Sequence, residues 1–166
     1  EHILQSYEAK KGLTAGIFYQ DKLVGIAGFN AFDWTNRIGY IGYWIGQDYQ
    51  GYGIITSVVR ALTDYAFTEA QLNRVDIRAA FTNKKSRAIP ERLGFKEEGI
   101  LRQSEWLYDH YVDHVVYGML ASDWVEKICP EPSCQGHVPA VPERRQVGPG
   151  VRTVEIFGQV EAHLFA

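Results

Sequence analysis

The stretch YWIGQDYQGYGIIT, residues 43–56, decides how the rest of the chain is interpreted. A strand rich in aromatic residues and isoleucine runs here into Gly46, Gly51 and Gly53, and then directly into apolar sequence of helical type. Glycine inside regular structure costs roughly 0.5–1 kcal/mol relative to alanine, so this cluster requires a structural reason. The usual reasons are a turn with positive φ or a main chain that a ligand approaches closely.

The bulk composition fits one domain with a hydrophobic core. Of the 166 residues, 46% are apolar and 22% charged, and the net charge of −3 gives no reason to expect nucleic acid or a membrane surface as partner. No apolar run approaches the ~20 residues of a membrane span, and no basic-then-apolar leader is recognisable. The only cysteines are Cys129 and Cys134, so we expect no disulfide framework and a cytoplasmic location.

The composition changes near Trp124, and we predict a domain boundary at about residue 125. Residues 1–124 contain a single proline, whereas residues 125–166 contain the other five prolines and both cysteines. The first part is predicted to have the order β-β-β-α-β-α-β-β after the end of a helix, which makes an α+β fold with helices packed on a mixed sheet. The expected elements are a helix end at 1–12, strands at 13–20, 22–32 and 36–45, a helix at 51–70, a strand at 74–81, a helix at 84–93, and strands at 95–103 and 111–121.

A glycine-rich turn between a strand and a helix is typical of a phosphate site. The N-terminus of a helix offers free N–H groups and the positive end of a dipole. A P-loop, however, requires lysine where Tyr52 stands, and a dinucleotide-binding loop requires a third glycine where Thr56 stands. A glycine-capped turn without any ligand is the simplest alternative.

The segment DYQGYG (48–53) resembles the acetyl-CoA loop of the GNAT N-acetyltransferases, [R/Q]-x-x-G-x-[G/A], with Asp48 in place of the basic or amide residue. Together with its flanks, WIGQDYQGYGIIT, it looks like the RimJ/RimL-type branch of that family. The resemblance implies a GNAT acyltransferase fold with a splayed, mostly antiparallel sheet, and main-chain amides that hold the diphosphate of acetyl-CoA. The cofactor-binding residues implied in this region are Trp44, Ile45, Gln50, Gly51, Tyr52, Gly53, Ile54, Ile55 and Thr56.

A second stretch, TNKKSRAIPERLGF (82–95), resembles the N-x-x-S segment of the same family. The resemblance implies that Asn83 and the helix it opens hold the pantetheine arm, and that Ser86 protonates the departing thiolate. Asn83 equally suits a helix N-cap, and Ser86 equally suits a capping or surface position. The basic residues nearby are expected to be solvated, or to include one that meets the 3′-phosphate of CoA: Lys84, Lys85 and Arg87.

The third stretch, EGILRQSEWLYDHYVDHVVYGML (98–120), is similar to the ending of RimL-type enzymes, in which a glutamate is the proposed general base. Here that residue is Glu105. An amine is protonated at neutral pH and attacks a thioester only after losing a proton, which a carboxylate can accept. A backbone N–H near Trp44 or Ile45 is expected to polarise the thioester carbonyl. The alternative for Glu105 is an ordinary exposed carboxylate at a strand end.

Four charged or titratable residues lie close to Glu105 in the sequence. They form either an acidic mouth that attracts a cationic acceptor or a polar hairpin tip, and no metal site is expected among them. Tyr111 is an alternative catalytic acid, while the tryptophans here are expected in the core or a pocket wall. The four residues are Asp109, His110, Asp113 and His114.

The resemblance covers about residues 1–124. The family usually begins with a strand and one or two helices before the position of residue 1, so we expect N-terminal elements to be missing. The open sheet edge then requires cover from preceding residues, a second copy in a homodimer, or the tail. In the tail, Cys129, Cys134 and His137 lack a fourth metal ligand, and residues 151–165 are expected to form one or two strands.

Together the three stretches predict an acetyl-CoA-dependent N-acetyltransferase without a metal. Its acceptor is expected to be a primary amine, first of all a protein N-terminus. Two alternatives stay open: a CoA-binding module without catalysis, and an acetyltransferase for a small molecule such as a polyamine or aminoglycoside. The fold alone does not separate them.

Overall fold

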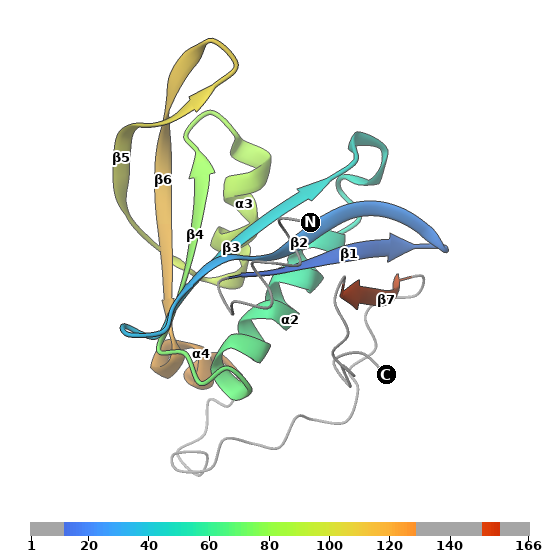
Figure 1. Cartoon of the computed structure of the whole chain (residues 1–166), viewed down its shortest axis with the longest axis horizontal. Helices are drawn as coiled ribbons and strands as arrows, with labels where there is room; N and C mark the ends of the chain where they lie inside the picture. Colours follow the sequence, from blue (N-terminus) through green and yellow to red (C-terminus); the bar gives the residue numbers. More distant parts are fainter. Residues whose placement is uncertain (1–11, 129–150, 157–166) are drawn as a thin grey trace.

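A seven-stranded sheet forms the centre of the computed structural model, which describes residues 12–128 and 151–156 (Figure 1). The elements in chain order are β1 Leu13–Tyr19, β2 Lys22–Asp33, β3 Ile38–Ile45, the 3₁₀ helix η1 Gln47–Tyr49, α2 Ile54–Thr68, β4 Arg74–Ala80, α3 Lys84–Leu93, β5 Lys96–Leu107, β6 His110–Leu120, α4 Ala121–Ile128 and β7 Val151–Ile156.

The sheet has the strand order β5-β6-β4-β3-β2-β1-β7, and only β3 and β4 are parallel. That pair is short, running from Ile38 opposite Arg74 to Ile41 opposite Ile77. Beyond it β3 continues along β2, and β4 continues along β6. The two strands therefore diverge toward their C-terminal ends, as Figure 1 shows. The predicted α+β fold, with a splayed and mostly antiparallel sheet, is confirmed.

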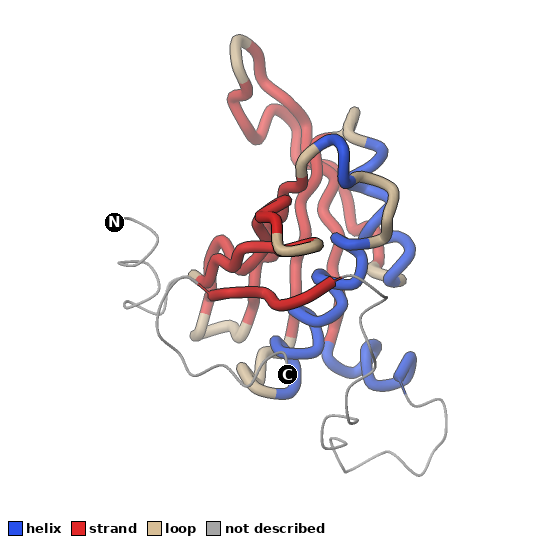
Figure 2. Tube along the Cα trace, turned by 90° about the vertical axis from the view of Figure 1, so that its right-hand side faces the viewer, coloured by secondary structure: helices blue, strands red, loops and turns tan. Residues whose placement is uncertain are grey.

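Helices α2 and α3 cover one face of the sheet, the face turned away from the viewer in Figure 1, and Figure 2 shows them beside it. Helix α2 packs by a stripe of buried side chains at helical spacing, which includes Ile55, Val59 and Leu62. Val75 and Val115, from β4 and β6, are fully buried against this layer. No helix in the described part of the chain is long and apolar enough to cross a membrane.

Most of the predicted elements are confirmed within a few residues, and the differences have local causes. Helix α2 begins at Ile54 rather than at residue 51, because Gly51 and Gly53 have φ values of +86° and +76°, outside the right-handed helical region. Strand β5 extends to Leu107 instead of residue 103. Helix α4 was not predicted. Of the helix end expected at 1–12, residues 1–11 lie outside the residues that the structure describes.

The tail contributes one strand to the sheet. Strand β7 pairs antiparallel with β1, where Ala15 lies opposite Ile156 and Tyr19 opposite Val151. This strand falls within residues 151–165, where the sequence predicts one or two strands. The domain boundary at residue 125 stays a prediction, and helix α4 runs across it. Cys129, Cys134 and His137 lie outside the residues that the structure describes.

Candidate active site

The turn that leads from η1 into α2 is built on two glycines in left-handed conformations. Gly53 is the N-cap of α2, with φ +76° and ψ 0°, and Gly51 has φ +86°. A side chain at φ near +60° costs roughly 1–2 kcal/mol, which explains why glycine occupies both positions. A Cβ atom added at either glycine meets no atom within 4 Å, so the space beside both is open. The turn thus leaves room for a ligand at the N-terminus of α2.

The amides of the first turn of α2 follow this glycine turn directly. The first hydrogen bond at this end of the helix runs from the Ser57 N–H to the Gly53 carbonyl, at 3.0 Å. The N–H groups of residues 54–56 therefore precede the helical ladder, and Gly53 has no side chain to cap them. Ile54 and Ile55 bury their side chains in the core, which fixes the orientation of the turn. Free amides and the positive end of a helix dipole are the features by which helix N-termini bind anions.

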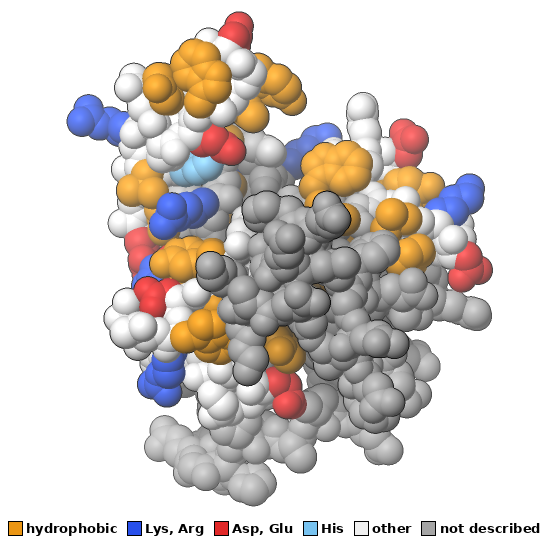
Figure 3. All heavy atoms as spheres, in the orientation of Figure 1, with side chains coloured by type: hydrophobic (Ala, Val, Ile, Leu, Met, Phe, Trp, Pro, Cys, Tyr) orange, Lys and Arg blue, Asp and Glu red, His pale blue; other side chains and the backbone are white. Residues whose placement is uncertain are grey.

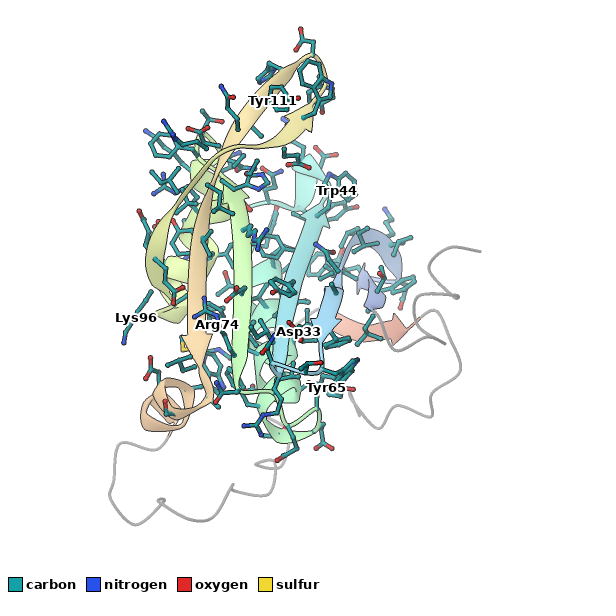
Figure 4. All side chains as sticks on the ribbon, turned by 60° about the vertical axis from the view of Figure 1, so that its left-hand side comes forward. Asp33, Trp44, Tyr65, Arg74, Lys96 and Tyr111 are labelled. Atoms are coloured by element: carbon teal, nitrogen blue, oxygen red, sulfur yellow. The ribbon has the colours of Figure 1, made fainter. Side chains whose placement is uncertain are left out.

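The parting of β3 and β4 brings a second helix start to the same end of the sheet. The glycine turn follows β3 after η1, and α3 follows β4 after a short turn at residues 81–83. Between residues 42 and 45, alternate main-chain groups of β3 point toward the gap, because β3 pairs with β4 only as far as Ile41. This is the region in which the carbonyl-polarising N–H near Trp44 or Ile45 is expected. Trp44 is 63% exposed, and Figure 4 shows it near the end of β3.

Helix α3 is tied to both sides of the gap. The Asn83 side chain accepts a hydrogen bond from the Ser86 N–H at 3.0 Å, so Asn83 is the N-cap of α3. The Tyr43 hydroxyl, on β3, donates to the Ser86 carbonyl at 3.0 Å. Burial raises the pKa of Tyr43 to about 12. Both main-chain groups of Ser86 are thereby held, which fixes the position of its side chain at the start of α3.

Two of the three basic residues at α3 have defined partners. Lys85 Nζ donates to Gln50 Oε1 at 2.9 Å, which places a positive charge next to the glycine turn. Arg87 was expected to be solvated or to meet a phosphate, but it is held in place. Its Nε donates to the Tyr117 hydroxyl at 2.9 Å, and its guanidinium contacts the Glu97 carboxylate at 3.3 Å. These contacts raise the pKa of Arg87. Arg87 therefore fastens α3 to the sheet.

Glu105 lies on the other face of the sheet, close to a histidine. Its Oε2 atom is 2.9 Å from Nε2 of His114, and the side chains are 51% and 17% exposed. His114 is paired with Ala80, the last residue of β4, beyond the point where β3 and β4 separate. Because directly opposed residues share a face, and the next residue, Val115, is buried under the helices, His114 and Glu105 face away from α2 and α3. Ser86 and Glu105 thus approach the sheet end from opposite sides.

Of the two alternatives for the residues near Glu105, the polar hairpin tip fits Asp109 and His110. Asp109 and His110 pair with each other at 2.9 Å at the exposed hairpin tip. The Asp113 carboxylate instead accepts a hydrogen bond from the Gln103 N–H at 2.8 Å. No group of three potential metal ligands occurs among the residues that the structure describes. The hairpin extends beyond the ends of β3 and β4, with Tyr111 near its tip (Figure 4).

Figure 3 shows the sheet face opposite α2 and α3, where hydrophobic side chains gather on the hairpin and over the strands below it. The large exposed ones on the hairpin are Ile100, Leu101, Trp106, Tyr108 and Tyr111. Trp106 and Tyr111 meet edge to face, with ring centroids 4.8 Å apart. A hollow of about 720 Å³ is lined by residues 100–104 and Asp113, none of which is a predicted cofactor residue. Trp106 therefore lies on the surface of the hairpin, outside the core.

Three contacts of the site were not predicted: Tyr43 with Ser86, Lys85 with Gln50, and His114 with Glu105. The first contact joins residues that are 43 positions apart in the sequence, and the second joins residues that are 35 positions apart. Both connect α3 to the segment that runs from β3 to the glycine turn. Sequence periodicity carries no signal for such pairs. The third had a signal, since His114 and Glu105 lie on the two strands of one predicted hairpin, but the register of that hairpin was not predictable.

The fold and the site agree with the comparison to known families. The sequence model of the acetyltransferase (GNAT) domain family matches residues 1–96, which is more than half of the chain. The chain therefore belongs to the GNAT acetyltransferase family. The matched range includes the glycine turn, Asn83 and Ser86, and it ends before Glu105.

Several of the similar proteins are named as acetyltransferases of ribosomal proteins. YdaF of Bacillus subtilis (strain 168) carries the provisional name of a ribosomal N-acetyltransferase. It is 43% identical to this chain over 72% of this chain and 66% of its own length. The ribosomal-protein-serine acetyltransferase of Escherichia coli (strain K12) is 36% identical over 63% of this chain and 58% of its own length. The chain thus spans about three fifths to two thirds of these relatives.

Solved structures show the same fold. A solved structure of RimL, a ribosomal L7/L12 alpha-N-protein acetyltransferase, in complex with coenzyme A has a TM-score of 0.69 at 28% identity, covering 74% of this chain and 69% of that one. The microcin C7 self-immunity acetyltransferase MccE, in complex with acetyl-CoA and AMP, gives a TM-score of 0.67 at 32% identity. The match covers 72% of this chain and 66% of that one.

Proposed function

We propose that this chain transfers the acetyl group of acetyl-CoA directly to a primary amine, and that the amine is the N-terminus of a protein of ribosomal type. The observation that supports this most is the meeting of two helix starts at the open end of β3 and β4, with free amides at α2 and Ser86 at α3. The acceptor follows from the relatives named for ribosomal proteins. Such an acceptor favours a cytoplasmic location.

The glycine turn is the proposed diphosphate site. The N–H groups from Gly51 to Thr56 bind the diphosphate oxygens, and the absence of Cβ atoms at Gly51 and Gly53 leaves the space for them. Lys85 adds a positive charge at Gln50, which offsets the presence of Asp48 where the family pattern has a basic or amide residue. Asn83 shapes the start of α3, along which the pantetheine arm runs between the separated strands.

Acetyl-CoA supplies an activated thioester, and the residues of the chain move the protons. Glu105 accepts a proton from the ammonium group, directly or through a water, and the free amine then attacks the carbonyl carbon. A main-chain N–H of residues 42–45 stabilises the charge that develops on the carbonyl oxygen. The carbon–sulfur bond breaks, the Ser86 hydroxyl gives a proton to the thiolate, and the proton that the nitrogen loses on becoming an amide returns to Ser86 through water. The positions of Glu105 and Ser86 on opposite faces suit an amine and a thiol on opposite sides of the reacting carbon.

The proposal is tested by following thiol release from acetyl-CoA in the presence of peptides with free N-termini, spermidine and an aminoglycoside. The Glu105→Gln variant should lower turnover by about 10²–10⁴-fold, because a general base contributes that much, while CoA affinity stays unchanged. Asp109→Asn, on the same hairpin and also paired with a histidine, is the matched control and should retain full turnover.

Three results distinguish this function from its rivals. Tight CoA binding without thiol release for any amine indicates a binding module. Release with spermidine or the aminoglycoside, but with no peptide, indicates a small-molecule acetyltransferase. Equal losses of CoA affinity and turnover in Glu105→Gln show that Glu105 supports cofactor binding and is not the base.

A further inference from the structure

We propose that His114 and a bulge in β5 together form a positioning device for Glu105. In this device the His114 Nε2–H donates to Glu105 Oε2 and leaves Oε1 free to accept a proton from the acceptor amine. The inference rests on the proposed acetyl transfer, in which Glu105 is the base. It assigns to His114 a role that acts through Glu105, with no contact to the acetyl group or the amine.

The register of the β5–β6 hairpin shows that the position of Glu105 is set by an irregularity. Leu101 lies opposite His114, and a regular antiparallel ladder continued from there would place Glu105 opposite His110, at the tip. Instead, the register shifts between Leu101 and Glu105, and Glu105 lies opposite Val112. The shift moves Glu105 two positions back along β6. It is thereby brought next to His114 and away from the solvent-exposed tip.

The irregularity has its own fastening. Gln103 has φ +49°, a conformation that non-glycine residues seldom adopt, and its N–H donates to Asp113 Oδ1 at 2.8 Å. Because β-bulges often re-aim a side chain next to an active site, a bulge held by a carboxylate suits the placement of a catalytic group. Asp113 is thus the residue that maintains the register on which the contact between Glu105 and His114 depends.

The two partners differ in how firmly they are held. Glu105 belongs to β5, an edge strand of the sheet, and its side chain is half exposed. His114 belongs to β6, which is paired on both sides, and its neighbour Val115 is fully buried. The Nε2 atom of His114 lies within hydrogen-bonding distance of Oε2, at 2.9 Å. The fixed imidazole therefore restricts the rotation of a carboxylate that the edge strand alone leaves free.

The test is a double-variant cycle in the thiol-release assay. His114→Leu should lower kcat about 10–100-fold, because misplacing a reacting group costs that much, with unchanged CoA affinity and thermal midpoint. His114→Gln, whose amide can place a donor near the position of Nε2, should restore most of kcat. In a Glu105→Gln background, His114→Leu should have no further effect. His110→Leu, at the hairpin tip, is the matched control and should behave as wild type.

Asp113→Ala provides an independent test of the bulge. It should reproduce the loss caused by His114→Leu, again only when Glu105 is present. The proposal is overturned when His114→Leu keeps full turnover, when it lowers kcat equally with and without Glu105, or when Gln and Leu at position 114 behave alike.

A measurement that needs no turnover separates this inference from the proposed function. The ¹⁵N NMR signals of the His114 ring should shift in Glu105→Gln, and those of His110 should not. Should the wild-type chain release no thiol with any amine, the proposed function and the role of Glu105 as base both fall. Unshifted His114 signals in an active enzyme overturn the positioning contact alone.

Discussion

Replacing Gly53 by alanine separates the conformational role of the glycine turn from its role in binding. Gly53 has φ +76° and ψ 0°, and a Cβ atom there meets no protein atom within 4 Å. The cost to folding is therefore conformational only, about 1–2 kcal/mol for an L-residue in the left-handed region. For a chain of this size, each kcal/mol corresponds to a fall in Tm of about 2–4 °C.

The effect on cofactor affinity is expected to exceed the effect on stability. A Cβ at Gly53 stands in the space assigned to the diphosphate and pushes it away from at least one amide of the first turn of α2. A hydrogen bond to a charged group is worth about 1.5–3 kcal/mol, so CoA affinity should fall about tenfold to a hundredfold. Isothermal titration with CoA measures this loss directly.

Gly94 provides the matched control, because it ends α3 with the same φ of +76° at a position remote from the glycine turn. Gly94→Ala should lower the thermal midpoint by a similar amount and leave CoA affinity unchanged. The reasoning is refuted if Gly53→Ala and Gly94→Ala lose similar stability while both bind CoA as tightly as the wild type. In that case the glycines serve the turn alone, and the diphosphate binds elsewhere.

Three further changes test the surroundings of the site. Asn83→Ala removes the cap from the Ser86 N–H and should cost about 1 kcal/mol in denaturant unfolding, whereas Asn83→Asp keeps the acceptor and the stability; equal stability of all three chains would contradict the cap. Burial raises the pKa of Tyr43 to about 12, so the folded state keeps its proton while the unfolded state loses it above about pH 10. Between pH 10 and 12 the free energy of unfolding of the wild type should therefore fall by about 2–3 kcal/mol more than that of Tyr43→Phe. If the two free energies fall in parallel with pH, the phenol is not buried. Trp124→Phe removes the 2.7 Å hydrogen bond to Asp64 and should destabilise by about 1–3 kcal/mol, measured at pH 7; a smaller loss would show that water replaces the indole.

Much of the fold was predictable because local patterns determine it. The stripe of Ile55, Val59 and Leu62 defines α2, and the alternation in β4 and β6 marks strands with one buried face. Gly53 and Gly94 mark the start of one helix and the end of another through their positive φ values. Helix α4 was missed because only Trp124 marks its core side before the composition changes.

The site was predictable only where a motif lies within one segment. The glycine turn and the Asn83 cap each depend on neighbouring residues, so sequence reasoning located them. The contact between Glu105 and His114 depends on a register shift in β5, which a hydrophobic pattern does not encode, since both registers keep the same residues on the same face. Arg87 was misjudged because its partner Tyr117 lies 30 positions further along the chain.

The short parallel pairing between β3 and β4 also has a mechanical consequence. Between Ile38 and Ile41 it is the only strand pairing that joins one half of the described sheet, β7-β1-β2-β3, to the other half, β4-β6-β5. The two halves of the described sheet are therefore joined only by this short seam and by the helices on one face of the sheet (Figure 1). A molecule bound where β3 and β4 separate would contact both halves, so the stiffness of the whole domain is expected to rise on binding.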